Sequence, residues 1–138
     1  MRRLELTRAQ VDEMIDHSRA EAPNECCGIL AGSDAKVEWV YRANNVDKSP
    51  VQYTIDPKDM ARISREADEA GMSVLGFYHS HTFSEAYPSI TDIKLAPPSD
   101  WFEFLYVIVS LADAAKPVLR VFRIADQRVE DATLEVTD

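Results

Sequence analysis

Residues 74–92 read VLGFYHSHTFSEAYPSITD, and they join a strand pattern to an unusual pair of histidines. Val74 to Tyr78 are apolar throughout, which is typical of a central strand in a sheet. His79 and His81 follow at the end of that strand. Because successive side chains of a strand alternate between its two faces, both imidazoles point to the same face, close enough to share one metal ion.

The downstream residues add a third candidate ligand. Ser89 can cap a short helix, predicted over residues 91–96, and Asp92 stands where the capping partner belongs. A capped helix holds its side chains rigidly, so Asp92 can serve both as capping partner and as ligand. His79, His81 and Asp92 then offer two nitrogens and one oxygen. They leave a fourth tetrahedral position open, which is the pattern of a catalytic rather than a structural zinc site.

Such a site also needs a carboxylate that takes a proton from water without binding the ion. Glu25 is one candidate because it immediately precedes the apolar run Cys26–Ala31, a predicted strand. Glu85 lies in the loop between the histidines and the aspartate and is the alternative. Position along the chain favours Glu25 and leaves Glu85 open.

Taken together, these residues resemble the JAMM (MPN+) metalloprotease family. The motif is His-Ser-His, seven residues, then Ser-x-x-Asp, with a glutamate ahead of Cys-Gly-Ile-Leu far upstream. The resemblance covers nearly the whole chain and implies a JAMM/MPN, cytidine-deaminase-like domain that binds Zn²⁺. Carried over by position, it implies zinc ligands at His79, His81 and Asp92, a general acid/base at Glu25, and an oxyanion-stabilising hydroxyl at Ser89.

The resemblance also implies a class of substrate. Family members cleave peptide or isopeptide bonds after the C-terminal glycine of ubiquitin or ubiquitin-like proteins. Within the family, residues 79–82, 85–89, 91–92 and 94–96 are similar to bacterial peptidases that release cysteine from the C-terminus of a ubiquitin-like sulfur-carrier protein. The resemblance therefore implies a zinc metallopeptidase of cysteine biosynthesis, whose partner is a sulfur carrier with a C-terminal Gly-Gly.

Two other functions stay open. The chain is short, which leaves little room for the insertions with which larger family members clamp ubiquitin, yet a general isopeptidase for ubiquitin-like conjugates remains an alternative. A non-catalytic MPN scaffold is the other. Scaffold members usually lack the histidines or the aspartate, and this sequence has all three.

Length and charge narrow the class of partner. The 138 residues suit a single domain over residues 1–138, with a short acidic C-terminal end. The 15 Lys and Arg against 24 Asp and Glu leave a formal net charge of -9, which argues against nucleic acid and against anionic membranes as partners. The longest apolar run, Phe104–Val109, is far shorter than the roughly 20 residues that span a bilayer.

Two further features suggest the compartment. The opening residues MRRLELTRAQ lack the apolar stretch of a secretory signal. Cys26 and Cys27 are adjacent, which favours burial in a strand over metal binding or a disulfide framework. We therefore expect a cytoplasmic protein. The sequence does not determine the oligomeric state, and a homodimer is left open.

Patterning along the chain predicts an α+β fold, with a mixed sheet between helices. Thr7 and Gln10 form a capping box for a first helix that Pro23 ends, and Asp56-Pro57 opens a second helix that stops at Gly71. We place His17 of the first helix at the surface. Strands are predicted at Cys26–Ala31, Lys36–Arg42, Gln52–Ile55, Val74–Tyr78, Phe104–Leu111, Val118–Ile124 and Arg128–Val136.

Overall fold

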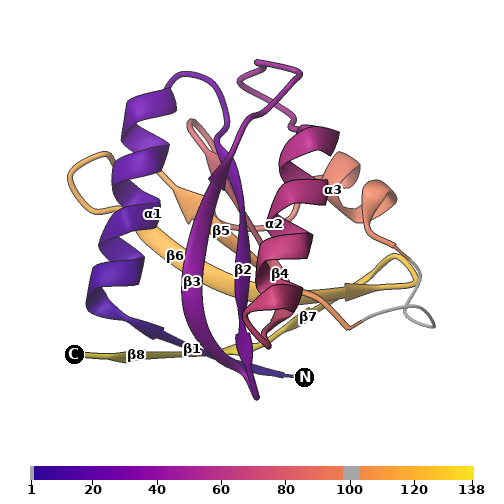
Figure 1. The fold of residues 1–138 in the computed structure, drawn as a ribbon. Helices are drawn as coiled ribbons and strands as arrows, with labels where there is room; N and C mark the ends of the chain where they lie inside the picture. The colour runs from indigo at the N-terminus through magenta and orange to yellow at the C-terminus, as the bar shows by residue number, and fades with distance from the viewer. Residues whose placement is uncertain (1, 98–102) are drawn as a thin grey trace.

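A computed structural model describes residues 2–97 and 103–138 of the chain. Strands and helices alternate irregularly, with the helices inserted singly between strands (Figure 1). In chain order the elements are β1 (Arg3–Thr7), α1 (Arg8–Glu21), β2 (Cys27–Ser33), β3 (Lys36–Ala43), α2 (Pro57–Glu69), β4 (Ser73–His81), α3 (Ile90–Leu95), β5 (Leu105–Ser110), β6 (Val118–Ala125), β7 (Arg128–Asp131) and β8 (Thr133–Thr137).

The strands form one mixed sheet in the order β7-β6-β5-β4-β2-β3-β1-β8. β4 stands in its middle, antiparallel to β2 and parallel to β5. β7 and β8 occupy opposite ends of the sheet although Ala132 alone separates them in the chain. The backbone N–H of Ala132 donates to the carbonyl of Val121 in β6. The sheet must therefore curl strongly enough to bring its two ends together.

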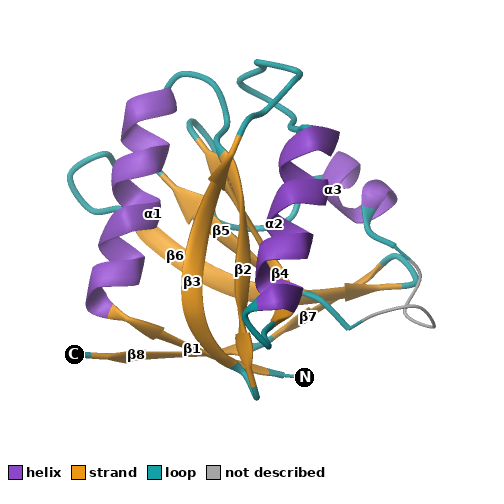
Figure 2. Ribbon diagram, in the orientation of Figure 1, coloured by secondary structure: helices purple, strands orange, loops and turns teal. Residues whose placement is uncertain are grey.

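Helices cover both faces of the sheet, α1 on one side and α2 with α3 on the other (Figure 2). Side chains of β4 alternate between the two faces of the sheet. Tyr78 packs in the core between the sheet and α1 (the α1 core), and Phe77 packs in the core between the sheet and α2 (the α2 core). The α1 core also includes Val11, Met14, Leu30 and Val107, and the α2 core includes Ile29, Ile63, Ile108 and Phe122. This arrangement confirms the predicted α+β class, a mixed sheet flanked by helices.

Local capping rules place the two long helices correctly. Thr7 Oγ1 accepts from the N–H of Gln10 at 3.1 Å, and Gln10 Oε1 accepts from the N–H of Thr7 at 2.9 Å. Asp56 caps α2 by accepting from the N–H of Lys58, and Gly71 follows the helix with a φ of 73°. Within the described residues, no helix is both long and apolar enough to cross a membrane.

Two predictions about strands are wrong, and one strand was not predicted. Gln52–Ile55 forms no strand, because only an isolated bridge joins Ile55 to Asn45. Arg128–Val136 is two strands, β7 and β8, because the chain changes its pairing partner at Ala132. The unpredicted strand is β1, whose buried Leu4 and Leu6 alternate with more exposed neighbours.

His17 is buried, so its predicted place at the surface is wrong. Its side chain is 4% exposed, and its Nδ1 lies 2.7 Å from the hydroxyl of Tyr78. Burial raises the pKa of Tyr78, so the phenol keeps its proton and can donate to His17. Gly28 makes room for this tyrosine, because a Cβ at that position would lie 2.0 Å from the Tyr78 ring.

The His17–Tyr78 contact gives a stability prediction. Replacing Tyr78 by Phe should lower the free energy of unfolding by about 1–3 kcal/mol, because Nδ1 of His17 loses its buried partner. Urea unfolding followed by circular dichroism measures the difference. Tyr106→Phe is the matched control, since Tyr106 is equally a buried tyrosine of the sheet and no hydrogen bond of its hydroxyl is found among the described residues. Equal stability of Tyr78→Phe and wild type would contradict this role.

Candidate active site

The site forms where β2 begins and β4 ends. The antiparallel register of these strands, extended two residues beyond its last pair, places Glu25 across from His81. Strand alternation then puts Glu25, His79 and His81 on the α2 face. Ser80, between the histidines, faces the α1 side, where its Oγ accepts from the N–H of Cys26 at 2.8 Å. The pairing of β2 with β4 thus brings together three of the predicted site residues, namely Glu25, His79 and His81.

Asp92 completes a compact triangle with the two histidines. His79 Nε2, His81 Nε2 and Asp92 Oδ2 lie 3.1 Å from one another in all three pairs. The three side chains are 1%, 4% and 7% exposed, respectively. Asp92 lies thirteen positions after His79 along the chain, so only the fold brings their side chains together.

A capping box holds Asp92 in place. Ser89 is the N-cap of α3, and its Oγ accepts from the N–H of Asp92 at 3.0 Å. Asp92 Oδ2 in turn accepts from the N–H of Ser89 at 2.9 Å. The carboxylate oxygen that faces the histidines is therefore fixed by the helix terminus. The Ser89 hydroxyl accepts here and keeps its own proton for another partner.

The imidazoles are oriented by different contacts. Nδ1 of His81 lies 2.9 Å from the carbonyl of Glu85, so it carries the proton and leaves Nε2 unprotonated in the neutral ring. His79 stacks on Tyr53, with ring centroids 4.4 Å apart and planes at 25°. Burial lowers the pKa of His79, which favours its neutral, ligating form. Both rings can present a lone pair to the centre of the triangle.

These donors fit a zinc ion. Four ligands at about 2.0–2.1 Å around a tetrahedral Zn²⁺ lie about 3.3 Å apart, close to the observed 3.1 Å. Burial alone would raise the pKa of Asp92, but in the metal-free protein His79 and His81, when their Nε2 atoms are protonated, outweigh it together with the N–H of Ser89 and hold the pKa below its ordinary value; a metal ion would take the place of those Nε2 protons. The aspartate is thus an anion at neutral pH. Two neutral nitrogens and one anionic oxygen, converging on one point, are a suitable ligand set for zinc.

Glu25 lies beside this triangle. A carboxylate oxygen of Glu25 lies within 4.8 Å of a ring nitrogen of His79 and of His81, so Glu25 reaches the same point as the triangle. The residue is 4% exposed, and burial raises its pKa to about 8. Among the described residues, Glu25 Oε1 and His79 Nδ1 are the buried side-chain polar atoms without a hydrogen-bond partner. A buried carboxyl with a free oxygen and a pKa near neutrality suits proton transfer.

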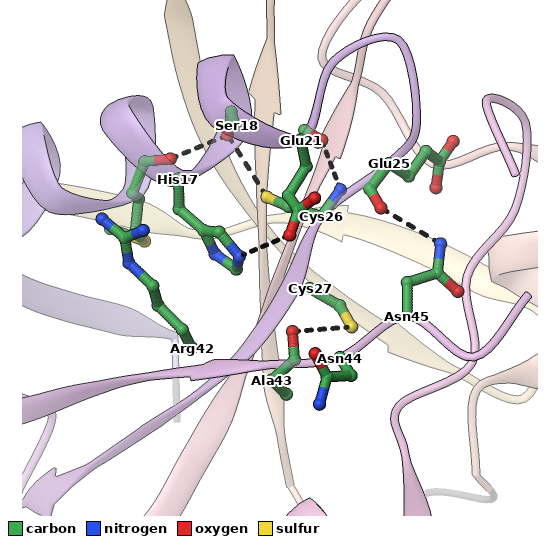
Figure 3. A network of polar contacts seen from close by, with 12 residues as sticks. His17, Ser18, Glu21, Glu25, Cys26, Cys27, Arg42, Ala43, Asn44 and Asn45 are labelled. Atoms are coloured by element: carbon green, nitrogen blue, oxygen red, sulfur yellow. Dashed lines mark hydrogen bonds and ion pairs between the residues drawn. The ribbon is translucent and has the colours of Figure 1, made fainter. Parts of the chain in front are cut away.

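The loop after β3 fixes the backbone of Glu25. The N–H of Glu25 donates to the carbonyl of Ser49 at 2.8 Å. Asn45 Nδ2 donates to the carbonyl of Glu25 at 3.0 Å (Figure 3). It also donates to the carbonyl of Gln52 at 3.0 Å. Asn45 was not among the predicted site residues, although the Asn44-Asn45 pair after a strand is a signal for a structured turn.

The structure does not favour Glu85 as the acid/base or Cys27 as a thiolate ligand. The side chain of Glu85 is exposed, and the contact found for this residue at the site is through its carbonyl. Cys27 is fully buried, and burial raises the pKa of its thiol to about 12, so it does not supply a thiolate. Both cysteines are free of disulfides.

Two cavities open beside the site and differ in polarity. One, of about 520 Å³, is lined by Glu25 and mostly polar neighbours, including Asn24, Asn44 and Lys48. The other, of about 360 Å³, is lined by Asp92 and Tyr53 with mostly apolar neighbours, including Met60, Phe77 and Leu95. The acid/base candidate and the ligand candidate thus face different cavities.

Comparisons with known proteins identify the family of the chain. The family described as prokaryotic homologs of the JAB domain matches residues 7–125. The chain is 36% identical over 130 residues to the CysO-cysteine peptidase of Mycobacterium tuberculosis, covering 93% of this chain and 87% of the relative. It is 38% identical over 115 residues to the desampylase of Haloferax volcanii, covering 78% and 81%. A solved structure from Desulfitobacterium hafniense is 36% identical, with a TM-score of 0.88, covering 98% of this chain and 93% of that one.

The triangle gives a prediction for metal content. Asp92→Ala should lose most bound zinc, because it removes one of three protein ligands and the loss should exceed the roughly 10–100-fold effect of outer-shell changes. Elemental analysis after dialysis measures zinc per chain. Glu85→Gln is the matched control and should keep one zinc. A tightly held zinc in Asp92→Ala would show that the ligand set is wrong.

The raised pKa of Glu25 gives a prediction for the metal-free protein. Below about pH 4.5 the glutamate is protonated in both folded and unfolded chains. Between pH 4.5 and 8 the unfolded chain loses this proton while the folded chain keeps it, so wild type loses stability relative to Glu25→Gln. The difference should grow by about 1.4 kcal/mol per pH unit in this window. Urea unfolding of chelator-treated proteins from pH 5 to 8 tests it, and a difference that does not change with pH contradicts it.

Proposed function

The chain belongs to the JAB-domain (JAMM/MPN) family of peptidases, and from this premise we propose that it is a zinc-dependent peptidase that removes cysteine from the C-terminal glycine of a ubiquitin-like sulfur-carrier protein. The observation that carries the proposal is the buried triangle of His79, His81 and Asp92 with the unpartnered oxygen of Glu25 beside it. A scaffold that only binds partners has no use for a buried, unpaired acid next to three converging ligands.

Glu25 moves the proton in this scheme. A bound zinc ion supplies Lewis acidity, which makes water nucleophilic at neutral pH and polarises a carbonyl. Oε1 of Glu25 accepts the proton that the attacking water gives up as its oxygen adds to the glycine carbonyl. The same oxygen returns that proton to the leaving amine as the carbon–nitrogen bond breaks. A carboxyl whose pKa lies near neutrality can do both.

Ser89 has a second task besides capping α3. Its Oγ accepts from the N–H of Asp92, so its own hydroxyl hydrogen is available to donate. Ser89 is partly buried and lies one helical turn from the aspartate ligand. In this position the hydroxyl stabilises the negative charge that develops on the carbonyl oxygen. The α3 N-terminus thus contributes both a ligand and an oxyanion donor.

The substrate assignment rests on likeness and on steric reasoning. The mycobacterial CysO-cysteine peptidase matches nearly the whole chain, which supports a sulfur carrier with C-terminal Gly-Gly as the partner. Glycines before the scissile bond have no side chains, so the carbonyl can approach a buried site closely. The two free, buried cysteines agree with a reducing compartment, and we place the enzyme in the cytoplasm.

A second candidate function is cleavage of proteins conjugated to a ubiquitin-like modifier. The observation that favours it is the 38% identity to a desampylase over 78% of the chain. Both functions use the same triangle and the same acid/base. They differ in the leaving group, which is a single amino acid in one case and a lysine side chain of a folded protein in the other.

The test uses a ubiquitin-like carrier ending in Gly-Gly-Cys and zinc-loaded enzyme. Mass spectrometry should show loss of one cysteine residue, at a rate well above that of diubiquitin cleavage. Glu25→Gln should keep its zinc and lose about 10²–10⁴-fold in rate. Glu85→Gln, at an exposed glutamate nearby, is the matched control and should stay close to wild type.

Other outcomes lead to other functions. Equal rates on the carrier and on diubiquitin would identify a general isopeptidase. Cleavage of neither substrate by zinc-loaded protein would identify a scaffold.

A further inference from the structure

We propose that the cavity beside Glu25 binds the leaving amino acid and that Lys48 recognises the α-carboxylate of that amino acid. The inference rests on the proposed peptidase function and adds a specificity-determining residue to it. It predicts that the enzyme selects a leaving group with a free carboxylate next to the scissile nitrogen. A C-terminal cysteine has such a carboxylate, whereas an isopeptide-linked lysine side chain does not.

The position of Glu25 decides which cavity takes the leaving group. The group that protonates the leaving amine must lie next to it, and Glu25 lines the cavity of about 520 Å³. That volume lies within the range of about 300–1,000 Å³ that is usual for small-molecule sites. The cavity of about 360 Å³ is lined by Asp92 and by mostly apolar residues, which suits the acyl side of the substrate. The leaving amino acid therefore occupies the polar cavity.

Lys48 is placed to receive an anion in this cavity. It lines the wall, its side chain is exposed, and its ammonium makes no ion pair with any described residue. A tight turn carries it, in which the N–H of Lys48 donates to the carbonyl of Asn45 and the backbone φ of Lys48 is 44°. The same Asn45 holds the carbonyl of Glu25. The turn thus fixes the backbone of Lys48 and that of Glu25 relative to each other.

The other charged groups of the wall are the acidic residues Glu21, Glu25 and Asp56. Asp56 caps α2 by accepting from the N–H of Lys58. Glu21 lies 3.9 Å from Nε2 of His17. Of the residues that line this cavity in the described chain, Lys48 alone carries a positive charge. In a protein with a net charge of -9, a lone unpaired lysine beside the acid/base is a feature that structure alone does not require.

Two neutral groups complement the lysine. Asn24 and Asn44 line the same cavity, and no hydrogen bond of either side-chain amide is found among the described residues. Their NH₂ groups can donate to the second oxygen of a carboxylate. The ammonium of Lys48 with these amides gives a recognition site for one carboxylate, and Glu25 lies on the same wall for the amine.

Binding to a protein that cannot turn over tests this directly. The protein is the zinc-loaded full chain with Glu25→Gln, and the probes are a labelled peptide ending in Gly-Gly-Cys and the same peptide as its C-terminal amide. Fluorescence anisotropy should show about 10–100-fold tighter binding of the free acid, the range of a charge-assisted hydrogen bond. Adding Lys48→Met should remove this preference by weakening the acid alone. Lys48→Arg should keep most of it.

Lys116→Met is the matched control for loss of one positive charge, because Lys116 lies in the turn between β5 and β6, outside both cavities. It should leave the acid preference intact. Equal affinity for acid and amide, or an acid preference that survives Lys48→Met, would overturn the inference.

Cleavage separates this inference from the proposed function. Zinc-loaded protein with Glu25 intact should cleave the acid about 10–100-fold faster than the amide at low substrate concentration, and Lys48→Met should slow only the acid. Equal cleavage of both peptides would leave the peptidase standing and remove the role of Lys48. Acid-selective binding without any cleavage would support the anion site and contradict the peptidase.

Discussion

The antiparallel register between β2 and β4 is the constraint on which the site depends. It places Glu25 across from His81, and a slip of one residue would turn the Glu25 side chain to the α1 face. Contacts on the α1 face hold this register, since Ser80 bonds to Cys26 through its side chain and its backbone. Gly28 adds to it, because only a glycine leaves space for the Tyr78 ring. Packing on one face of the sheet therefore sets the chemistry on the other.

The site combines groups whose burial is costly with elements that offset part of that cost. Burial raises the pKa of Glu25 and lowers the pKa of His79, so it favours the uncharged form of both side chains. Burial would also raise the pKa of Asp92, but the adjacent His79 and His81, when protonated, and the N–H of Ser89 stabilise its anion and keep the pKa below its ordinary value. The fold thus keeps one permanent anion for a cation and one carboxyl that titrates near neutrality, within one buried cluster.

Local patterns predicted the parts of this structure that local physics determines. The histidine pair, the capping boxes at Thr7 and Ser89, and Asp56-Pro57 depend on residues within one turn, and all were found. The errors concern partners far away in the chain. β1 exists because β8 pairs with it, and His17 is buried because Tyr78 lies above it. No periodicity within a short window carries that information.

The two faces of β4 differ in how their buried polar groups are satisfied. On the α1 face, His17 bonds Tyr78, Ser18 bonds the Met14 carbonyl, and Ser80 bonds Cys26. On the α2 face, Glu25 Oε1 and His79 Nδ1 have no partner within the described parts of the chain. Folded proteins rarely leave such atoms unpaired, because each costs about 1–3 kcal/mol. On the α1 face, this same sheet gives its buried polar groups hydrogen-bond partners. The unpaired atoms on the α2 face therefore indicate a surface shaped for ligands outside the chain.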